Sequence, residues 1–307
     1  MEAIKISCLT KTFGDLRAVD DLTLSVPQGE IFGLVGPDGA GKTTTLRLLS
    51  AILSPTSGDA WIMNKHIVQE AEALKEEIGY MSQHFGLYPD LTVMENIHFY
   101  ADIYGVPRRS RDSKIDGLLS FSNLTPFKNR LAGNLSGGMK QKLGLVCALI
   151  HTPKVLFLDE PTNGVDPISR RDFWRILYPL LREKVTIFIS TAYLDEAERC
   201  NRVGLIHKGR LLACGTPLEV KKLMQGTLLE IRSSEPRKAT TLLRQWFGAD
   251  LVSLFGDRVH VITQEPDRTL VQVEGILTEA GLKVLDIRSI EPTLEDVFIS
   301  VLARRKR

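Results

Sequence analysis

The sequence predicts an α/β domain followed by a smaller α+β domain. Three observations carry this prediction: a glycine-rich loop between an apolar run and a helical pattern, a second apolar run that ends in two carboxylates, and a change of pattern after Gly226. The chain has 307 residues, of which 43% are hydrophobic and 25% charged, so it is long enough for about two globular domains.

The glycine-rich loop matches a phosphate-binding pattern. Residues 36–44 read Gly-Pro-Asp-Gly-Ala-Gly-Lys-Thr-Thr, after a strand-like run at 30–35 and before a helical pattern at 44–49. Phosphates would lie at a helix N-terminus, where backbone N–H groups and the positive end of the helix dipole favour anions. Lys42 is expected to reach the β- and γ-phosphates and Thr43 to bind Mg²⁺. The expected phosphate-binding residues are Gly36, Pro37, Asp38, Gly39, Ala40, Gly41, Lys42, Thr43 and Thr44. The alternative is an ordinary glycine turn.

The second apolar run, Val155 to Leu158, is followed by Asp159 and Glu160. Four apolar residues in a row are typical of a strand buried on both faces of a parallel sheet, whose carboxyl end faces the ligand. We expect Asp159 to lie near Mg²⁺ and Glu160 to act as the general base toward a water molecule. The alternative is a strand that ends in solvated carboxylates.

A second helix start follows Leu135, where the chain reads Ser-Gly-Gly-Met-Lys-Gln. Ser136 is a suitable N-cap, and apolar residues recur at three- to four-residue spacing from Met139 to Ile150. Gly137 and Gly138 would therefore expose N–H groups to a second anion. The alternative is that the Gly-Gly pair is an ordinary turn before a helix, with no role in binding.

With these motifs in this order, the chain resembles the ATP-binding cassette (ABC) family over roughly residues 1–225. The resemblance implies a P-loop NTPase cassette with a mixed sheet core, an antiparallel β subdomain and a helical subdomain at about 85–134. It implies ATP and Mg²⁺ as cofactors, and a dimer, with itself or with another cassette, in which Ser136, Gly137, Gly138 and Gln141 cap the ATP of the opposite subunit.

The resemblance implies roles for three further residues. Phe13 is placed where the family stacks an aromatic ring on adenine, although a phenylalanine beside a strand is more often core. Gln83 occupies the position of a Mg²⁺ ligand and nucleotide sensor. Asp166 is placed to cross the dimer interface, and the alternative for its Asn-Gly-Val-Asp-Pro segment is a solvated turn.

One position departs from the family pattern. After the strand expected at 185–191, the family has a histidine that contacts the γ-phosphate, and this chain has Ala192. Loss of such a contact slows hydrolysis by about 10²- to 10⁴-fold without preventing nucleotide binding. Three accounts stay open: pairing with a cassette that retains the histidine, modest turnover supported by Glu160 and a rebuilt contact, or an engineered alanine. The first makes the chain a mainly ATP-binding regulatory cassette.

The tail from 226 to 307 is expected to be a separate domain. Strand and helix patterns there follow the order β-α-β-β-α-β, which predicts a ferredoxin-like fold. Its last segment, Ile290 to Phe298, resembles the closing helix of ATP-binding subunits of the multidrug and daunorubicin-resistance type, so the resemblance favours export.

Two regions are candidates for contact with a membrane system. Thr92 and Glu95 predict a capping box that opens a helix. The preceding segment, 85–89, is placed where the family contacts a membrane subunit, with satellite core packing as the alternative. The basic residues at 304–307 are expected to be a solvated tail rather than a lipid contact.

Composition limits the partners and the location. The net charge of +2 gives no strong field for nucleic acid. Cys8, Cys147, Cys200 and Cys214 lack paired spacing and are expected to be reduced, buried thiols. The sequence has no stretch of about 18 apolar residues and no secretory leader. We therefore expect a cytoplasmic protein. The resemblance to the ABC family implies that it is peripheral on the cytoplasmic face of the inner or plasma membrane and works with integral-membrane permease subunits of an ABC-2 type exporter.

Overall fold

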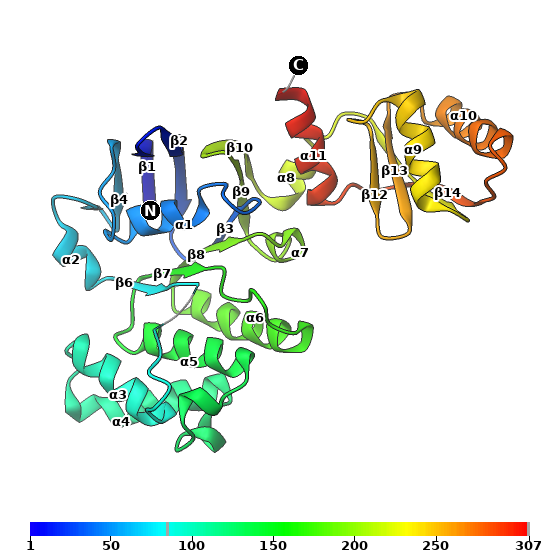
Figure 1. The fold of residues 1–307 in the computed structure, drawn as a ribbon. Helices are drawn as coiled ribbons and strands as arrows, with labels where there is room; N and C mark the ends of the chain where they lie inside the picture. Colours follow the sequence, from blue (N-terminus) through cyan, green and yellow to red (C-terminus); the bar gives the residue numbers. More distant parts are fainter. Residues whose placement is uncertain (84–85, 306–307) are drawn as a thin grey trace. The chain divides into compact units, whose positions relative to one another are not determined.

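The computed structural model describes residues 1–83 and 86–305, and the chain divides into two compact units, Met1–Thr216 and Pro217–Arg307 (Figure 1). Phe85 of the expected membrane-subunit segment and Lys306 and Arg307 of the basic tail lie outside the described residues. Within the described ranges, no helix combines the length and the apolar character needed to cross a membrane.

A six-stranded mixed sheet forms the centre of the first unit, in the order β10-β9-β3-β8-β7-β6. Its strands are β3 (Ile31–Val35), β6 (Ile78–Met81), β7 (Val155–Asp159), β8 (Thr186–Thr191), β9 (Arg202–His207) and β10 (Arg210–Gly215). Five strands run parallel and β10 pairs antiparallel with β9. Every residue of β3, β7 and β8 is buried, as expected for continuous apolar strands. The mixed sheet core is therefore confirmed.

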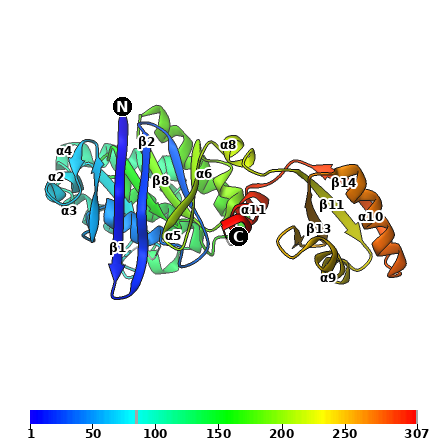
Figure 2. The ribbon, with the colours of Figure 1, turned by 90° about the horizontal axis from the view of Figure 1, so that it is seen from above.

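An antiparallel sheet of order β2-β1-β4-β5 packs against the central sheet. It consists of β1 (Glu2–Phe13), β2 (Leu16–Pro27), β4 (Ser57–Ile62) and β5 (Lys65–His66), and Figure 2 shows β1 and β2 running side by side. Ile4 from this sheet, Leu46 from helix α1 and Phe188 from β8 belong to one buried cluster. The antiparallel subdomain is therefore built onto the same core as the glycine-rich loop.

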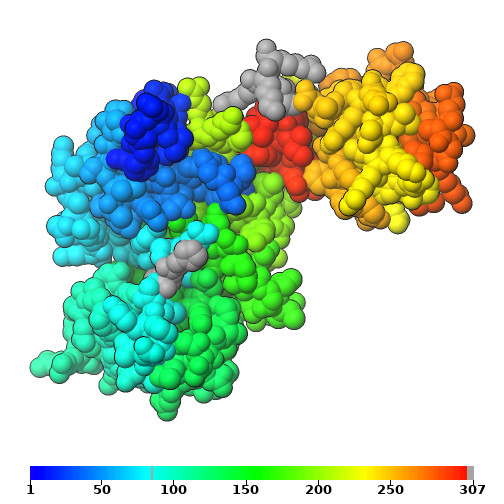
Figure 3. Space-filling model, in the orientation of Figure 1, coloured from blue at the N-terminus to red at the C-terminus, as the bar shows by residue number. Residues whose placement is uncertain are grey.

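The helices of the first unit include a separate group between β6 and β7. The helices are α1 (Lys42–Leu49), α2 (Ala71–Lys75), α3 (Val93–Ile103), α4 (Arg108–Ser122), α5 (Gly137–Leu149), α6 (Pro167–Arg182) and α7 (Leu194–Ala197), with 3₁₀ turns η1 (Thr125–Phe127) and η2 (Ala132–Asn134). Helices α3, α4 and α5 share their own hydrophobic cluster. Figures 1 and 3 show this group, cyan to green, as a lobe of its own. The capping box is confirmed: Glu95 N donates to Thr92 Oγ1 (3.2 Å), and Thr92 N donates to Glu95 Oε2 (2.7 Å).

The second unit has the predicted ferredoxin-like order. It contains α8 (Pro217–Lys221), β11 (Thr227–Ser233), α9 (Pro236–Phe247), β12 (Val252–Phe255), β13 (Arg258–Thr263), α10 (Pro266–Glu279), β14 (Val284–Ile290) and α11 (Leu294–Arg305). The antiparallel sheet has the order β12-β13-β11-β14. Helices α9 and α10 each begin at a proline in the first turn, where the missing N–H costs nothing.

The expectation of four buried thiols is wrong for two cysteines. Cys147 and Cys200 are buried, and burial raises the pKa of both thiols. Cys8 and Cys214 are exposed. Cys8 lies where the β1–β2 register shifts between Ile6 and Leu9, so the bulge turns it outward, and Cys214 lies on the edge strand β10.

Candidate active site

The glycine-rich loop connects β3 to α1 and is held by close backbone packing. A Cβ at Gly36 would lie 2.2 Å from Ile206 O, and one at Gly41 would lie 2.3 Å from Ala18 O. Gly41 is also the N-cap of α1, with a left-handed φ of 105°. No side chain caps α1 and its first turn has no acidic residue. Its first N–H groups are therefore available to an anion.

Lys42 lies inside this loop with only 4% of its surface exposed. Its Nζ donates to Gly36 O (2.7 Å) and Pro37 O (3.0 Å) and forms an ion pair with Glu160 Oε1 (2.9 Å). A buried ammonium needs such partners to offset its lost hydration. The loop therefore contains a desolvated positive charge at the N-terminus of α1.

Asp159 ends β7 and faces the first turn of α1. Its Oδ1 accepts from Thr43 Oγ1 (3.0 Å) and from Ser190 Oγ (2.7 Å). Its Oδ2 is buried without a hydrogen-bond partner among the described residues. An orphaned carboxylate oxygen beside a threonine hydroxyl suits a hard cation such as Mg²⁺. In the described part of the chain no group of three or more His, Cys, Asp or Glu side chains could hold a metal by itself.

Glu160 follows β7 with a left-handed φ of 47°, which turns its side chain toward the loop. Its N–H donates to the backbone and side-chain oxygens of Ser190 (3.1 and 3.0 Å). Besides the Lys42 pair, its Oε2 accepts from Asn163 Nδ2 (3.2 Å) and Gln83 Nε2 (3.4 Å). Three elements far apart in sequence thus meet at this carboxylate.

A cavity of about 690 Å³ opens over these groups. The sequence-predicted residues that line it are Phe13, Asp38, Gly39, Ala40, Gly41, Lys42, Thr43, Thr44, Gln83 and Glu160. Gly36, Pro37 and Asp159 lie beneath it, in contact with Lys42 or Thr43. Phe13 is 47% exposed and is not part of the core, and Lys11 Nζ lies over its ring, 5.2 Å from the centroid. The face that Lys11 does not cover would be available to a ligand.

Two basic residues at the cavity were not predicted. Arg17 begins β2 and Lys208 lies in the β9–β10 turn, about 160 residues from the loop. That turn is tied to the loop because Gly209 N donates to Ala40 O (2.9 Å). Neither residue belongs to a local motif. The pairing of β9 with β3 brings Lys208 to the loop, and the close packing of Gly41 against Ala18 brings the start of β2 there.

Five predicted residues lie outside this cavity: Ser136, Gly137, Gly138, Gln141 and Asp166. Ser136 caps α5 by accepting from Met139 N (3.4 Å), as predicted. Gly137 is exposed and has no neighbour where its Cβ would be, so it leaves the α5 N-terminus open. Asp166 caps α6 by accepting from Ser169 N and Ile168 N (3.0 and 3.1 Å), and these bonds lower the pKa of its carboxyl.

Beyond β8 the chain carries the exposed Ala192, next to a buried carboxylate that sequence reasoning missed. Glu196 is 0% exposed and accepts from Thr162 Oγ1 (2.5 Å) and Thr191 Oγ1 (2.9 Å). Arg170 Nε lies 3.4 Å from it. Its partners come from three other segments, namely the loop after β7, the end of β8 and helix α6, so periodicity gives no signal for it.

Comparison with known proteins agrees with this geometry. Residues 19–163 match the sequence profile of the ABC transporter family. The chain is 42% identical over 304 residues to a probable multidrug ABC transporter ATP-binding protein of Escherichia coli (strain K12); the match covers 97% of this chain and 52% of that protein, so the chain spans about half its length. It is 36% identical to a bacitracin transport ATP-binding protein of Bacillus licheniformis, with 97% of each chain covered.

Solved structures show the same likeness. A cassette of an ABC transporter in its ADP conformation matches with a TM-score of 0.65 and 26% identity, covering 71% of this chain and 92% of the other. An ATP-binding subunit of an ABC transporter matches with a TM-score of 0.65 and 27% identity, covering 72% and 92%.

Proposed function

The chain belongs to the ABC transporter family of ATP-binding proteins, and we propose that it binds and hydrolyses Mg-ATP to power export of a drug or other hydrophobic compound through separate membrane subunits. One observation carries the ATPase part of the proposal. Lys42, Glu160, Gln83 and the Thr43–Asp159 pair converge at the uncapped N-terminus of α1.

Each of these groups has a role in the proposed reaction. The N–H groups of the loop and the Lys42 ammonium bind the phosphates, and Phe13 stacks on adenine. Thr43, Asp159 and Gln83 hold Mg²⁺, which neutralises phosphate charge when bound. Glu160 accepts the proton of the attacking water, and Asn163 and Gln83 orient its carboxylate through the bonds to Oε2.

Residues Ser136, Gly137, Gly138 and Gln141 at the start of α5, called the signature residues below, complete the site from a second cassette, identical or different. Ser136, Gly137, Gly138 and Gln141 lie outside the cavity of their own chain, and the open N-terminus of α5 suits a γ-phosphate presented by a partner. Asp166 lies beside this face on the α6 cap. The nucleotide would then form part of the dimer interface.

Export and membrane coupling are supported by the relatives and by the α3 region. The relatives named above are described as multidrug and bacitracin transport proteins, and a third, 32% identical, as a daunorubicin resistance protein. The described segment from Gly86 is fixed to α3, since Tyr100 Oη donates to Gly86 O (2.8 Å) and Asn96 bonds Tyr88 through both N–H (2.9 Å) and C=O (3.0 Å). Tyr88 itself is 46% exposed, so a membrane subunit on the cytoplasmic face could contact its ring.

A second candidate function rests on Ala192. If the missing histidine disables this site, the chain is a mainly ATP-binding regulatory cassette that pairs with an intact one. Both functions keep nucleotide binding, so they differ in turnover alone.

Steady-state Mg-ATP hydrolysis by the purified chain tests the proposal, with Glu160→Gln and Ala192→His beside the wild type. We expect wild-type turnover at least about 10²-fold above Glu160→Gln, with ATP binding retained in the variant. Measurable and equal rates in these two proteins would refute Glu160 as the base. If the wild type shows no measurable hydrolysis and Ala192→His restores it, the regulatory function would be established instead.

A further inference from the structure

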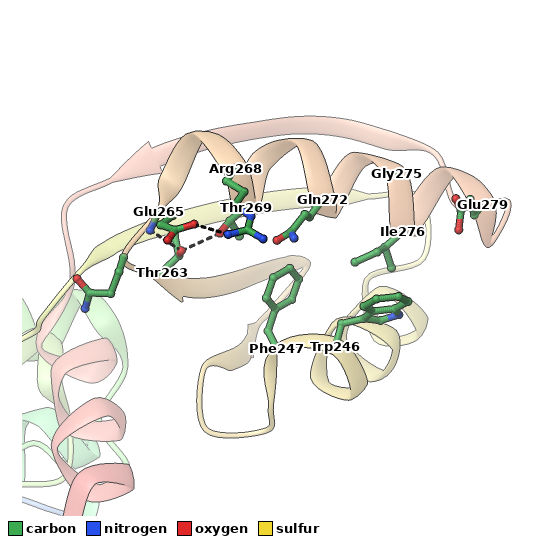
Figure 4. A pocket seen from close by; sticks show the side chains of 11 residues that line it. Trp246, Phe247, Thr263, Glu265, Arg268, Thr269, Gln272, Gly275, Ile276 and Glu279 are labelled. Carbon is green, nitrogen blue, oxygen red and sulfur yellow. Dashed lines mark hydrogen bonds and ion pairs between the residues drawn. The ribbon is translucent and has the colours of Figure 1, made fainter.

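The second unit contains a groove of about 570 Å³ that the proposed ATPase cycle does not use. It lies between α10 and the C-terminal end of α9, and Figure 4 shows the rings of Trp246 and Phe247 facing the side of α10 that carries Gln272 and Ile276. Small-molecule sites have volumes of about 300–1,000 Å³ and combine aromatic walls with a few polar groups. The groove meets both conditions.

Trp246 provides the aromatic wall. Its side chain is 67% exposed although indole is among the most hydrophobic side chains, so its face is available to a ligand. Ile276 is half-buried on the opposite wall. A flat apolar group would fit between them.

Two residues on the groove face of α10 are poor choices for the helix itself. Gly275 lies in the helix interior, yet a Cβ there would meet nothing within 4 Å in the described chain. Neither packing nor backbone geometry requires this glycine, which is less favourable than alanine in a helix. Glu279 places a carboxylate at the negative end of the helix dipole, in a last turn without basic residues. Residues four apart share a helix face, so Gly275 and Glu279 both line the same groove.

The charged side chains that line the groove determine whether it favours a cationic or an anionic ligand. Arg268 is paired with Glu265 (Nη1 to Oε2, 3.0 Å), which neutralises it locally. Glu279 then gives the groove a net negative charge, reinforced by the helix C-terminus. A cation beside Glu279 would also be attracted to the face of a neighbouring indole.

We propose that this groove binds a planar aromatic organic cation, with its ring on Trp246, its edge over Gly275 and its positive group beside Glu279. The inference rests on the second unit alone and does not depend on whether the chain hydrolyses ATP.

Fluorescence anisotropy of rhodamine 6G, a planar cationic dye, titrated with the full chain in the absence of nucleotide tests the proposal. We expect saturable binding that excess Mg-ATP does not displace, and no comparable binding of fluorescein, a planar anion. Displacement by Mg-ATP would assign the dye to the nucleotide site and overturn the proposal. Equal binding of both dyes would overturn the choice of a cation.

Variants of the lining locate the dye. Trp246→Ala and Glu279→Gln should each weaken rhodamine 6G binding about 5- to 30-fold, the range of a cation–π or charge contact. Gly275→Leu should fill the groove and abolish binding while leaving thermal unfolding unchanged or raising its midpoint.

Val271→Ala and Glu274→Gln are matched controls, because both residues are exposed on α10 outside the groove. They should bind the dye as the wild type does. Absence of saturable binding in the wild type, or binding that survives both Trp246→Ala and Gly275→Leu, would overturn the proposal.

Discussion

At the residue scale, Glu196 is the side chain on which the loop after β8 depends. Its carboxylate joins Thr162, after β7, to Thr191, at the end of β8, and lies beside Arg170 of α6. Arg170 in turn stacks over the Tyr193 ring at 4.1 Å. Glu196 therefore fixes the segment that contains Ala192 without reaching the cavity itself.

Glu196→Gln keeps the shape of the side chain and removes its charge. We expect a loss of about 1–3 kcal/mol in stability, because Arg170 loses its buried partner, and a larger fall in kcat than change in KM for ATP. Thermal unfolding and steady-state kinetics measure the two effects. Asp195→Asn is the control, since Asp195 is exposed and lies 3.8 Å from the same arginine. Similar behaviour of the two variants would contradict a positioning role for Glu196.

At the element scale, the contact of α5 with α6 depends on a missing side chain. A Cβ at Gly138 would lie 2.5 Å from Ser169 Cβ, closer than atoms pack. Helix α5 can therefore approach α6 this closely only because residue 138 is a glycine. This packing requirement adds to the role that the ABC resemblance implies for Gly138 at ATP.

Gly138→Ala should destabilise the first unit by about 1–3 kcal/mol through overpacking. Ser169→Gly in the same chain should restore most of this loss, which urea unfolding of the single and double variants would measure. The double variant also separates packing from catalysis. Restored stability with turnover still reduced would point to contact with nucleotide, whereas no rescue of stability would contradict the packing account.

A second element-scale feature is the attachment of α11 to the sheet of its own unit. Asp296 is buried and accepts from His260 Nδ1 (2.8 Å) and from Thr293 N and Oγ1 (2.9 and 2.6 Å). Burial alone would raise the pKa of this carboxyl, but the His260 and Thr293 bonds outweigh it and hold the pKa below its ordinary 3.8. His260 also lies 3.7 Å from Glu230, which pairs with Arg258 and Arg288.

Asp296→Asn should loosen α11, with hydrogen exchange of its amides about 5- to 150-fold faster at pH 7 for a loss of about 1–3 kcal/mol. Because the folded pKa is depressed, the stabilisation is present above the unfolded value of about 3.9 and is lost as the pH falls through the folded pKa. The difference between variant and wild type should therefore persist from pH 7 to pH 5 and shrink below about pH 4.

Glu295→Gln is the control for this measurement. Burial and the neighbouring Asp296 charge raise the pKa of Glu295, so its charge does not stabilise the fold and its removal should leave exchange unchanged or slower. An Asp296→Asn effect that vanishes already at pH 5 would contradict the assignment to this carboxyl.

The limits of sequence reasoning also follow from individual contacts. The phosphate loop, the Thr92 capping box and the Ser136 cap were predictable, because each is made by residues within a few positions of one another. The ferredoxin-like order was predictable from strand and helix periods. Arg17, Lys208 and Glu196 were not, since their neighbours come from other elements. Cys8 was predicted wrongly because a bulge reverses the alternation of β1.

At the scale of the whole molecule, the proposed cycle requires two cassettes. Glu160→Gln should form a dimer with Mg-ATP and remain a monomer with ADP, because the signature residues bind only a γ-phosphate from a partner. Sedimentation velocity with each nucleotide checks this. Ser136→Arg, which would obstruct the open N-terminus of α5, should prevent the dimer while leaving ATP binding to the monomer intact. A dimer that forms equally with ADP, or in the Ser136→Arg variant, would contradict nucleotide-dependent closure.

The ion pair between Lys42 and Glu160 joins the cation that we assign to phosphate to the carboxylate that we assign to water. While this ion pair is intact, the Glu160 carboxylate is not free to accept a proton from water, and the Lys42 ammonium is not free to bind phosphate. An arriving triphosphate competes for the ammonium, and in doing so it releases the carboxylate. The substrate's own charge would thus switch on the residue that consumes it.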